Sequence, residues 1–197
     1  MTSRRLVLQG LSATALVPFS AKSQTFPSKP IRFVMPYAPG GSSEILARPI
    51  AQELSRTLGQ SVFVDFKPGG GTTIGADFVA KSAPDGHTLV MMLSAHAINA
   101  TLMPKLPYDT VKDFAPITLI SKVPSLYVVH PDLPVKNLKE FVAYAKARPG
   151  QLNYASAGIG VTNHLAGEQL NMMAGIRMQH IPYKGGGPAL TDLIGGQ

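Results

Sequence analysis

The chain has 197 residues, of which 45% are hydrophobic and 15% charged, and this apolar content is sufficient for a packed core. It contains no cysteine, which excludes disulfide bonds, thiolate metal sites and a cysteine nucleophile. The formal charge is +7, but the Lys and Arg residues are scattered without a long basic run, so the sequence does not favour nucleic-acid binding.

The first 23 residues have the organisation of an export signal. Arg4 and Arg5 precede an apolar stretch at 6–19, which is too short to span a membrane, and small residues ending at Ser23 resemble a cleavage site. We therefore expect residues 1–23 to be a signal peptide that directs the chain to the periplasm. The paired arginines are similar to a twin-arginine signal, and both the twin-arginine and the Sec routes stay open.

Strand and helix patterns alternate in the first half of the mature chain. Uninterrupted apolar runs are typical of buried parallel strands, and apolar residues spaced three or four apart are typical of helices that cover them. Strands are expected at 31–37, 61–66 and 87–93, and helices at 44–58 and 74–82.

The second half continues the alternation. Two strands are expected at 114–123 and 125–130, separated at Pro124, and further strands at 152–157 and 178–183. Asn137 and Glu140 predict a capping box at the start of a helix, and Gly175 predicts the end of another. A last short helix is expected at 188–194.

This order predicts an α/β protein with mostly parallel sheets. We expect two lobes, residues 24–124 and residues 125–197. The second lobe looks incomplete at its C-terminus, because a βαβ pattern would deliver another strand after the last helix.

Four turns share one design, since each follows a strand, is rich in glycine and opens a helix. Helix N-termini present unpaired N–H groups, and glycine allows a ligand to approach that backbone closely. In parallel α/β sheets such turns gather at the carboxyl ends of the strands, where ligands bind. The turns are 39–43, 68–73, 156–162 and 184–188.

Several enzyme signatures are only partly present. The sequence around Ser156 is close to a nucleophile elbow but has Tyr154 in place of its first glycine, and an exported serine hydrolase using Ser156 stays open as an alternative. The glycine turns match neither a dinucleotide fingerprint nor a phosphate loop, and the five histidines lack the spacing of a metal site. We therefore expect no cofactor and no metal. His96 and His164 are the histidines best placed for ligand contact.

The motifs together strongly resemble the tripartite tricarboxylate transporter solute receptors, also called Bug-type receptors. The resemblance runs from about Phe26 to Gln197 and rests on five segments in the family's order: "PSKPIRFVMPYAPGGSSEILAR", "KPGGGTTIGADFVAKSAPDGHTL", "LPYDTVKDFAPITLI", "LNYASAGIGVTNHLAGE" and "IPYKGGGPALTDLIGG". Family members often have Asp where Glu44 stands and a different second loop, and they continue well beyond Gln197.

The resemblance implies a two-lobed periplasmic binding protein of the type II, flytrap-like kind. Such a receptor is not an enzyme; it is expected to bind a small carboxylate in the cleft between its lobes, as a monomer, and to deliver it to membrane-embedded transporter subunits. The sequence leaves open which carboxylate is bound and whether the output is transport or sensory signalling.

The residues that the resemblance maps to the ligand site lie in the glycine turns and in the segment after the third strand. They are Ala38, Pro39, Gly40, Gly41, Ser42, Ser43, Gly70, Gly71, Thr72, Thr73, Ser94, His96, Asn99, Ser156, Ala157, Gly158, Thr162, His164, Tyr183, Lys184 and Gly185.

Overall fold

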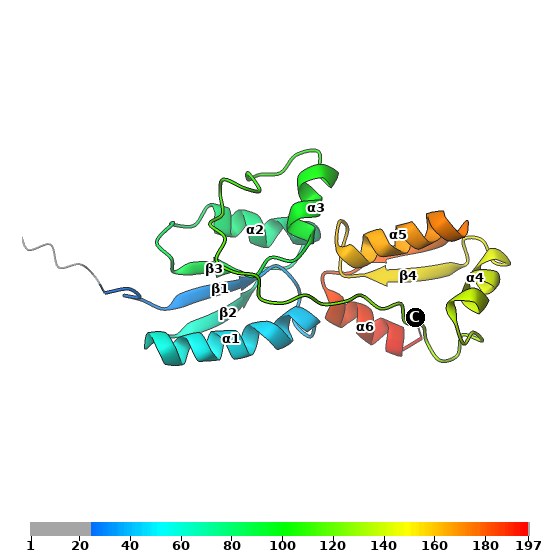
Figure 1. Ribbon diagram of the computed structural model, residues 1–197, viewed down its shortest axis with the longest axis horizontal. Coiled ribbons are helices and arrows are strands. Elements are labelled where there is room, and N and C mark those ends of the chain that lie inside the picture. The colour runs from blue at the N-terminus through cyan, green and yellow to red at the C-terminus, as the bar shows by residue number, and fades with distance from the viewer. Residues whose placement is uncertain (1–24, 197) are drawn as a thin grey trace, which may run out of the picture.

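The computed structural model describes residues 25–196, and Figure 1 shows two α/β units arranged along its long axis. One unit holds a three-stranded sheet and the other a two-stranded sheet, and both sheets are entirely parallel. The predicted α/β architecture is therefore confirmed. The predicted signal peptide lies outside the described residues, and the lobe boundary at residue 124 stays a prediction.

The first sheet has the strand order β2-β1-β3, with β1 in the centre. Helix α1 covers one face of this sheet and α2 the other (Figure 1). The elements of this unit are β1 (Ile31–Met35), α1 (Ser42–Leu58), β2 (Val62–Phe66), the 3₁₀ turn η1 (Gly70–Thr72), α2 (Thr73–Ala80), β3 (Thr88–Val90) and α3 (Ala95–Leu102).

The core of this unit forms between β1 and α1. Alternate residues of β1 point to the two faces of the sheet, and Ile31, Phe33 and Met35 pack against Ala47 and Ala51 of α1. Full burial of each large side chain contributes about 1.5–3 kcal/mol. This packing fixes the carboxyl end of β1, where the first glycine turn begins.

The second unit is built on β4 and β5. Its elements are α4 (Leu138–Lys146), β4 (Leu152–Ser156), α5 (Thr162–Ala174), β5 (Met178–Pro182) and α6 (Gly186–Ile194). Asn137 caps α4 as predicted, because the Glu140 N–H donates to Asn137 Oδ1 at 3.0 Å. The reciprocal bond of the predicted capping box differs, since the Glu140 carboxylate accepts from the Lys136 N–H rather than from the Asn137 N–H. Gly175 ends α5 in the left-handed conformation, as predicted.

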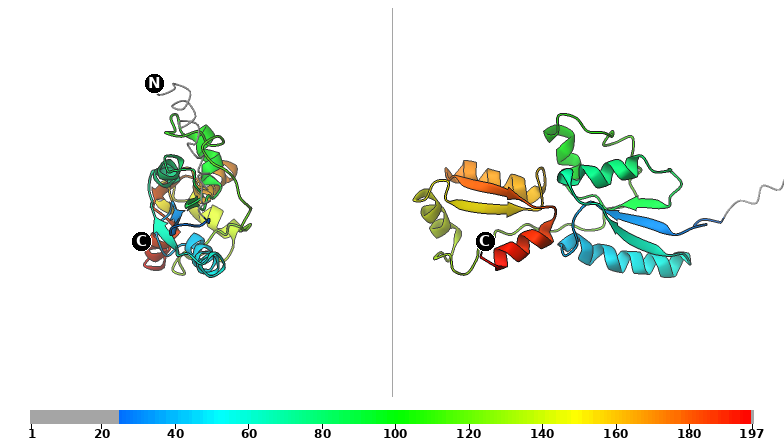
Figure 2. Two further views of the ribbon diagram at one scale, coloured as in Figure 1. Left: turned by 90° about the vertical axis from the view of Figure 1, so that its left-hand side faces the viewer. Right: turned by 180° about the vertical axis from the view of Figure 1, so that it is seen from behind.

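The two strands predicted at 114–123 and 125–130 are absent, and this prediction was wrong. Residues 114–130 carry no regular structure, and large side chains such as Ile117, Leu119 and Leu126 are exposed. Strand-forming residues do not make a strand without a neighbour that pairs with their backbone, and no strand of residues 25–196 pairs with this segment. The right view of Figure 2 shows the segment running between the two units as an irregular strand-free connection.

Helix α3 was not predicted, because no element was assigned to the segment that follows the strand expected at 87–93. It follows β3 directly and carries Asn99, which is fully buried. None of the helices within residues 25–196 has the length and hydropathy needed to cross a membrane.

The packing of α2 against β1 depends on Gly75. A Cβ added at Gly75 would lie 2.8 Å from Pro36 Cβ and 3.0 Å from the Lys67 carbonyl oxygen, and backbone does not yield easily. We expect Gly75→Ala to lower the free energy of unfolding by about 1–3 kcal/mol, measured by chemical denaturation.

Gly186→Ala is the matched control, because nothing lies within 4 Å of a Cβ added there. A Gly75→Ala variant as stable as the Gly186→Ala variant would contradict this description of the packing.

Candidate functional site

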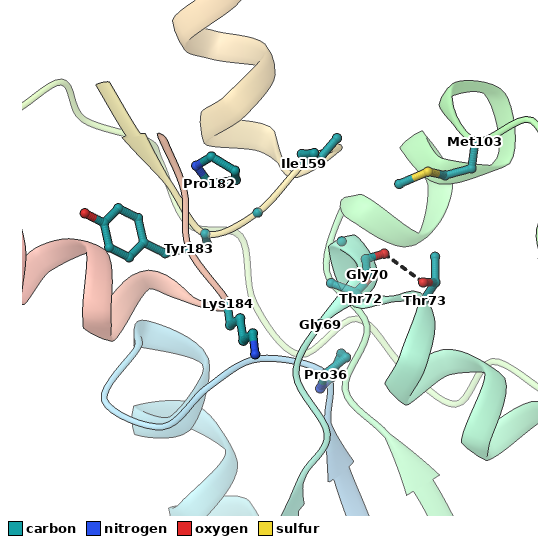
Figure 3. Close-up of a pocket in the computed structure, with 13 residues that line it drawn as sticks. Pro36, Gly69, Gly70, Thr72, Thr73, Met103, Ile159, Pro182, Tyr183 and Lys184 are labelled. Atoms are coloured by element: carbon teal, nitrogen blue, oxygen red, sulfur yellow. Dashed lines mark hydrogen bonds between the residues drawn. The ribbon is translucent and has the colours of Figure 1, made fainter. Parts of the chain in front are cut away.

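A cavity of about 420 Å³ opens where the two units meet, and Figure 3 shows the residues around it. Twelve of its 13 lining residues lie in the segments that follow the carboxyl ends of β1, β2, β4 and β5 or at the last residue of a strand. The exception is Met103, which follows α3. The lining residues are Pro36, Gly69, Gly70, Gly71, Thr72, Thr73, Met103, Ala157, Gly158, Ile159, Pro182, Tyr183 and Lys184.

The second glycine turn forms one wall of this cavity. Its backbone has positive φ at four consecutive residues, namely 121° at Gly69, 58° at Gly70, 60° at Gly71 and 84° at Thr72. A β-branched residue such as Thr72 rarely adopts this conformation, which costs of the order of 1–3 kcal/mol. The surrounding structure must therefore hold the turn in place.

Two side-chain hydrogen bonds hold it. The Thr73 hydroxyl donates to the Gly70 carbonyl at 2.7 Å, as drawn in Figure 3, and Asn99 Nδ2 donates to the Gly71 carbonyl at 2.7 Å. Asn99 belongs to α3 and is fully buried. Its uncharged side-chain amide supports the turn from that helix. The helix that sequence reasoning missed is thus a positioning element of the site.

The third turn, after β4, faces the second turn at very short range. A Cβ added at Gly71 would lie 2.3 Å from the Ile159 carbonyl oxygen, and one added at Gly160 would lie 2.4 Å from Asn99 Oδ1. Neither position has room for a side chain. The Ser94 hydroxyl also makes a hydrogen bond with the Thr162 hydroxyl, which joins the same two units.

The first and fourth turns also contact each other closely through their backbones. The Ala38 N–H donates to the Lys184 carbonyl at 2.9 Å, and a Cβ added at Gly187 would lie 2.5 Å from the Pro39 carbonyl oxygen. The Gly40 N–H donates to Glu44 Oε2 at 2.5 Å. This N–H first, and then Arg48, lowers the pKa of the half-buried Glu44 carboxyl.

Ser156 and His180 support the third turn from beneath. The fully buried Ser156 hydroxyl donates to the Gly158 carbonyl at 2.9 Å and lies 2.6 Å from His180 Nε2. The His180 ring stacks on His164, with ring centroids 4.1 Å apart. Burial and then the neighbouring His164 lower the pKa of His180, while Glu168 acts in the opposite direction.

The structure brings only part of the predicted site to the cavity wall. Eight predicted residues line it: Gly70, Gly71, Thr72, Thr73, Ala157, Gly158, Tyr183 and Lys184. The others lie in supporting contacts or outside the cavity, and their contact with a ligand stays a prediction. They are Ala38, Pro39, Gly40, Gly41, Ser42, Ser43, Ser94, His96, Asn99, Ser156, Thr162, His164 and Gly185.

His96 is the clearest example of a residue placed elsewhere. Its ring packs against Tyr108 and Phe114, and its Nε2 lies 2.9 Å from the Thr110 carbonyl oxygen. Sequence reasoning missed five lining residues, Pro36, Gly69, Met103, Ile159 and Pro182. Three of them, Gly69, Ile159 and Pro182, adjoin predicted residues, so the glycine turns were an adequate signal for these. Pro36 lies two residues before the predicted Ala38, and Met103 comes from beyond an unpredicted helix.

The site offers hydrogen-bond donors and apolar surface rather than reactive groups. Among residues 25–196, no three His, Cys, Asp or Glu side chains gather as metal ligands would. Lys184 is the one charged residue in the lining. Such an arrangement can bind a small polar molecule.

Comparison with known proteins identifies the family. The model of the tripartite tricarboxylate transporter family receptor matches residues 46–197. The chain belongs to this family. It is also 38% identical to the protein BugT of Bordetella pertussis, over 100% of this chain and 61% of that protein. The chain thus spans about three fifths of the length of the curated relatives that it matches.

Solved structures agree with this assignment. A structure of an R. palustris protein with adipate has a TM-score of 0.83 and 37% identity, covering 87% of this chain and 57% of that one. MatC from Rhodopseudomonas palustris with bound malate has a TM-score of 0.82 and 38% identity, covering 87% and 59%. A periplasmic transporter structure has a TM-score of 0.79 and 41% identity, covering 87% and 58%.

These matches confirm the predicted periplasmic-binding-protein fold, present over part of its length. They also confirm that the family binds solutes and is not enzymatic, which decides against a hydrolase. The close contact between Ser156 and His180 is accordingly structural. Its buried hydroxyl fixes the backbone of the third turn.

His180 makes the stability of the chain dependent on pH. Because its pKa lies below the ordinary value of about 6.5 in the folded chain, the unfolded chain takes up a proton first as the pH falls. The contribution of neutral His180 is therefore present above pH 6.5 and is lost as the pH falls below it. Between pH 7.5 and pH 5.5 the free energy of unfolding of the unmodified chain should fall, and we expect it to fall less in His180→Phe. Urea denaturation at the two pH values measures both changes.

The comparison uses the slope of the free energy of unfolding against pH in the unmodified chain and in His180→Phe. The difference between these two slopes isolates His180 from the other titrating groups. Identical slopes for the two proteins would mean that folding does not perturb the His180 ring.

Proposed function

We propose that the chain is an exported receptor that captures a small carboxylated organic anion and delivers it to the membrane subunits of a tripartite tricarboxylate-type transporter. The observation that carries this proposal is the cavity at the carboxyl ends of strands from both sheets, with glycine turns as its walls. Parallel α/β proteins bind ligands at this edge.

The family and its solved members support the ligand class. The family description names a transporter receptor, and two similar structures hold adipate and malate, which are small carboxylates. The similar chain described as a periplasmic transporter, together with the signal peptide predicted at 1–23, supports export to the periplasm.

The chemistry of the cavity suits such a ligand. A carboxylate taken from water needs hydrogen-bond donors, and each hydrogen bond to a charged group contributes about 1.5–3 kcal/mol. Glycine backbone in the second and third turns lets the ligand approach N–H groups without interference from side chains. Pro36, Met103, Ile159 and Pro182 offer apolar surface to a carbon chain.

The size of the cavity agrees with a small organic acid. Its volume of about 420 Å³ is at the lower end of the range of small-molecule sites, about 300–1,000 Å³. Together, small volume, apolar surface and backbone donors favour a short aliphatic acid.

A thermal-shift screen of the purified chain tests this proposal. The panel contains small mono-, di- and tricarboxylic acids, each paired with its neutral amide as the control. A carboxylate at a hundredfold its dissociation constant should stabilise the fold by about 2.7 kcal/mol, which raises the melting temperature by roughly 5–10 °C for a chain of this size.

We expect at least one acid to stabilise the chain and its amide to have no effect. A folded chain that responds to no acid, or equally to acids and amides, would contradict the proposal.

A further inference from the structure

Two histidines of the second unit lie face to face beside the third glycine turn. The His164 ring of α5 stacks on the His180 ring of β5, with the ring centroids 4.1 Å and the ring planes 29° apart. Neither ring lines the cavity, although Ala157, Gly158 and Ile159 of the turn between β4 and α5 do. The stacked pair can therefore act on one wall of the cavity without being part of its surface.

His164 holds the turn through a hydrogen bond that only its neutral ring can make. The Gly160 N–H donates to His164 Nδ1 at 3.2 Å, so this nitrogen carries a lone pair and no proton. Gly160 is buried, and Asn99 of α3 lies against it. A proton on His164 Nδ1 would set two N–H groups against each other and leave the buried Gly160 N–H without an acceptor.

His180 holds the same turn through Ser156, and protonation does not remove that contact. Because the Ser156 hydroxyl donates to the Gly158 carbonyl at 2.9 Å, His180 Nε2 donates to the hydroxyl oxygen, and its Nδ1 is the nitrogen that can accept a proton. Burial and then His164 lower the pKa of His180. This favours His164 as the ring that takes up the first proton, and the stacking then disfavours a second positive charge beside it.

Tyr154 and Glu168 face the stacked pair. Tyr154 of β4 stacks on His180 with ring centroids 4.9 Å apart, and its hydroxyl donates to the Glu168 carboxylate of α5. Burial and then Glu168 raise the pKa of Tyr154, which therefore stays protonated near neutral pH. From α6, which packs against β4, Asp192 accepts a hydrogen bond from Tyr183. Of these side chains, histidine is the type that ordinarily changes charge between pH 5 and pH 8.

We propose that the His164–His180 pair is a pH-sensitive switch: neutral His164 holds the third turn in place as a cavity wall, and protonated His164 releases it. The chain then binds its carboxylate at neutral pH and releases it on acidification. This inference rests on the proposed function of the cavity, to which it adds a means of release.

A proton on His164 also has an effect that opposes the switch. It brings a positive charge nearer to an anionic ligand, and this attraction alone would tighten binding in acid. Because His164 lies outside the cavity lining, solvent and salt weaken the attraction, and loss of the wall outweighs it. The direction of the pH dependence distinguishes the two effects.

Amide hydrogen exchange of the unmodified chain without ligand tests the switch directly. Protection factors of the third turn, residues 156–162, are compared at pH 7.5 and pH 5.5 after correction for the intrinsic effect of pH on exchange. Residues 31–35 of the buried strand β1 serve as the reference for unfolding of the whole chain. We expect protection of the turn to fall at least tenfold in acid and that of β1 to fall less than twofold. An unchanged turn, or an equal fall in both segments, would overturn the switch.

Carboxylate binding tests the consequence, with adipate and malate as probes in calorimetry at the same two pH values. We expect the unmodified chain to bind at least one of them, and to bind it at least fivefold more weakly at pH 5.5. In His164→Asn the amide oxygen replaces Nδ1 as the acceptor and does not titrate, so the two affinities should agree within about twofold. His130→Asn is the matched control, because His130 Nδ1 also accepts a backbone N–H, from Asp132 at 3.3 Å, and should behave as the unmodified chain.

The outcomes distinguish the switch from the function on which it rests. Equal or tighter binding by the unmodified chain at pH 5.5, or an unchanged pH dependence in folded His164→Asn, would overturn the switch and leave carboxylate binding intact. Binding of neither acid at either pH would count against the proposed function, while the exchange experiment still decides whether acid releases the turn. Melting temperatures at both pH values show which variants are folded.

Discussion

Close backbone contact between glycine turns joins the two units and shapes the cavity between them. Gly71 lies against the Ile159 carbonyl, and Gly187 lies against the Pro39 carbonyl, at distances that no side chain could occupy. The turns can approach because the parallel strands of both sheets end at this junction, and the buried packing of β1 against α1 fixes where the first sheet ends. The position of the cavity follows from these contacts, since its walls are the same turns.

The turns have different roles in the structure. Beside the first turn, the Ala38 N–H donates to the Lys184 carbonyl of the other unit, and within the turn the Gly40 N–H donates to Glu44. The residues of this turn join the two units and do not line the cavity. The second, third and fourth turns supply the lining, with Asn99 and Ser156 as buried supports. Rigid, buried supports keep polar groups oriented before a ligand arrives, which reduces the entropic cost of binding.

Local chemistry allowed much of the fold to be predicted from the sequence. Apolar runs, the Asn137 N-cap and the helix-ending Gly175 act within a few residues, and the structure confirms them. The strands expected at 114–130 failed because a strand needs a pairing partner, which a local pattern does not reveal. The glycine turns indicated most of the cavity wall, but which turn faces which depends on contacts between distant residues such as Gly71 and Ile159.

The most direct test compares Gly71→Ala with Gly150→Ala, with the binding of the best-bound acid from succinate to adipate measured by calorimetry. Both glycines have positive φ, 60° and 76°, so both variants carry similar backbone strain, but a Cβ meets the Ile159 carbonyl only at Gly71 and nothing within 4 Å at Gly150. The predicted result is that Gly150→Ala binds like the unmodified chain, whereas folded Gly71→Ala binds at least tenfold more weakly. Equal binding by the two variants would contradict the claim that close contact between the glycine turns forms the site.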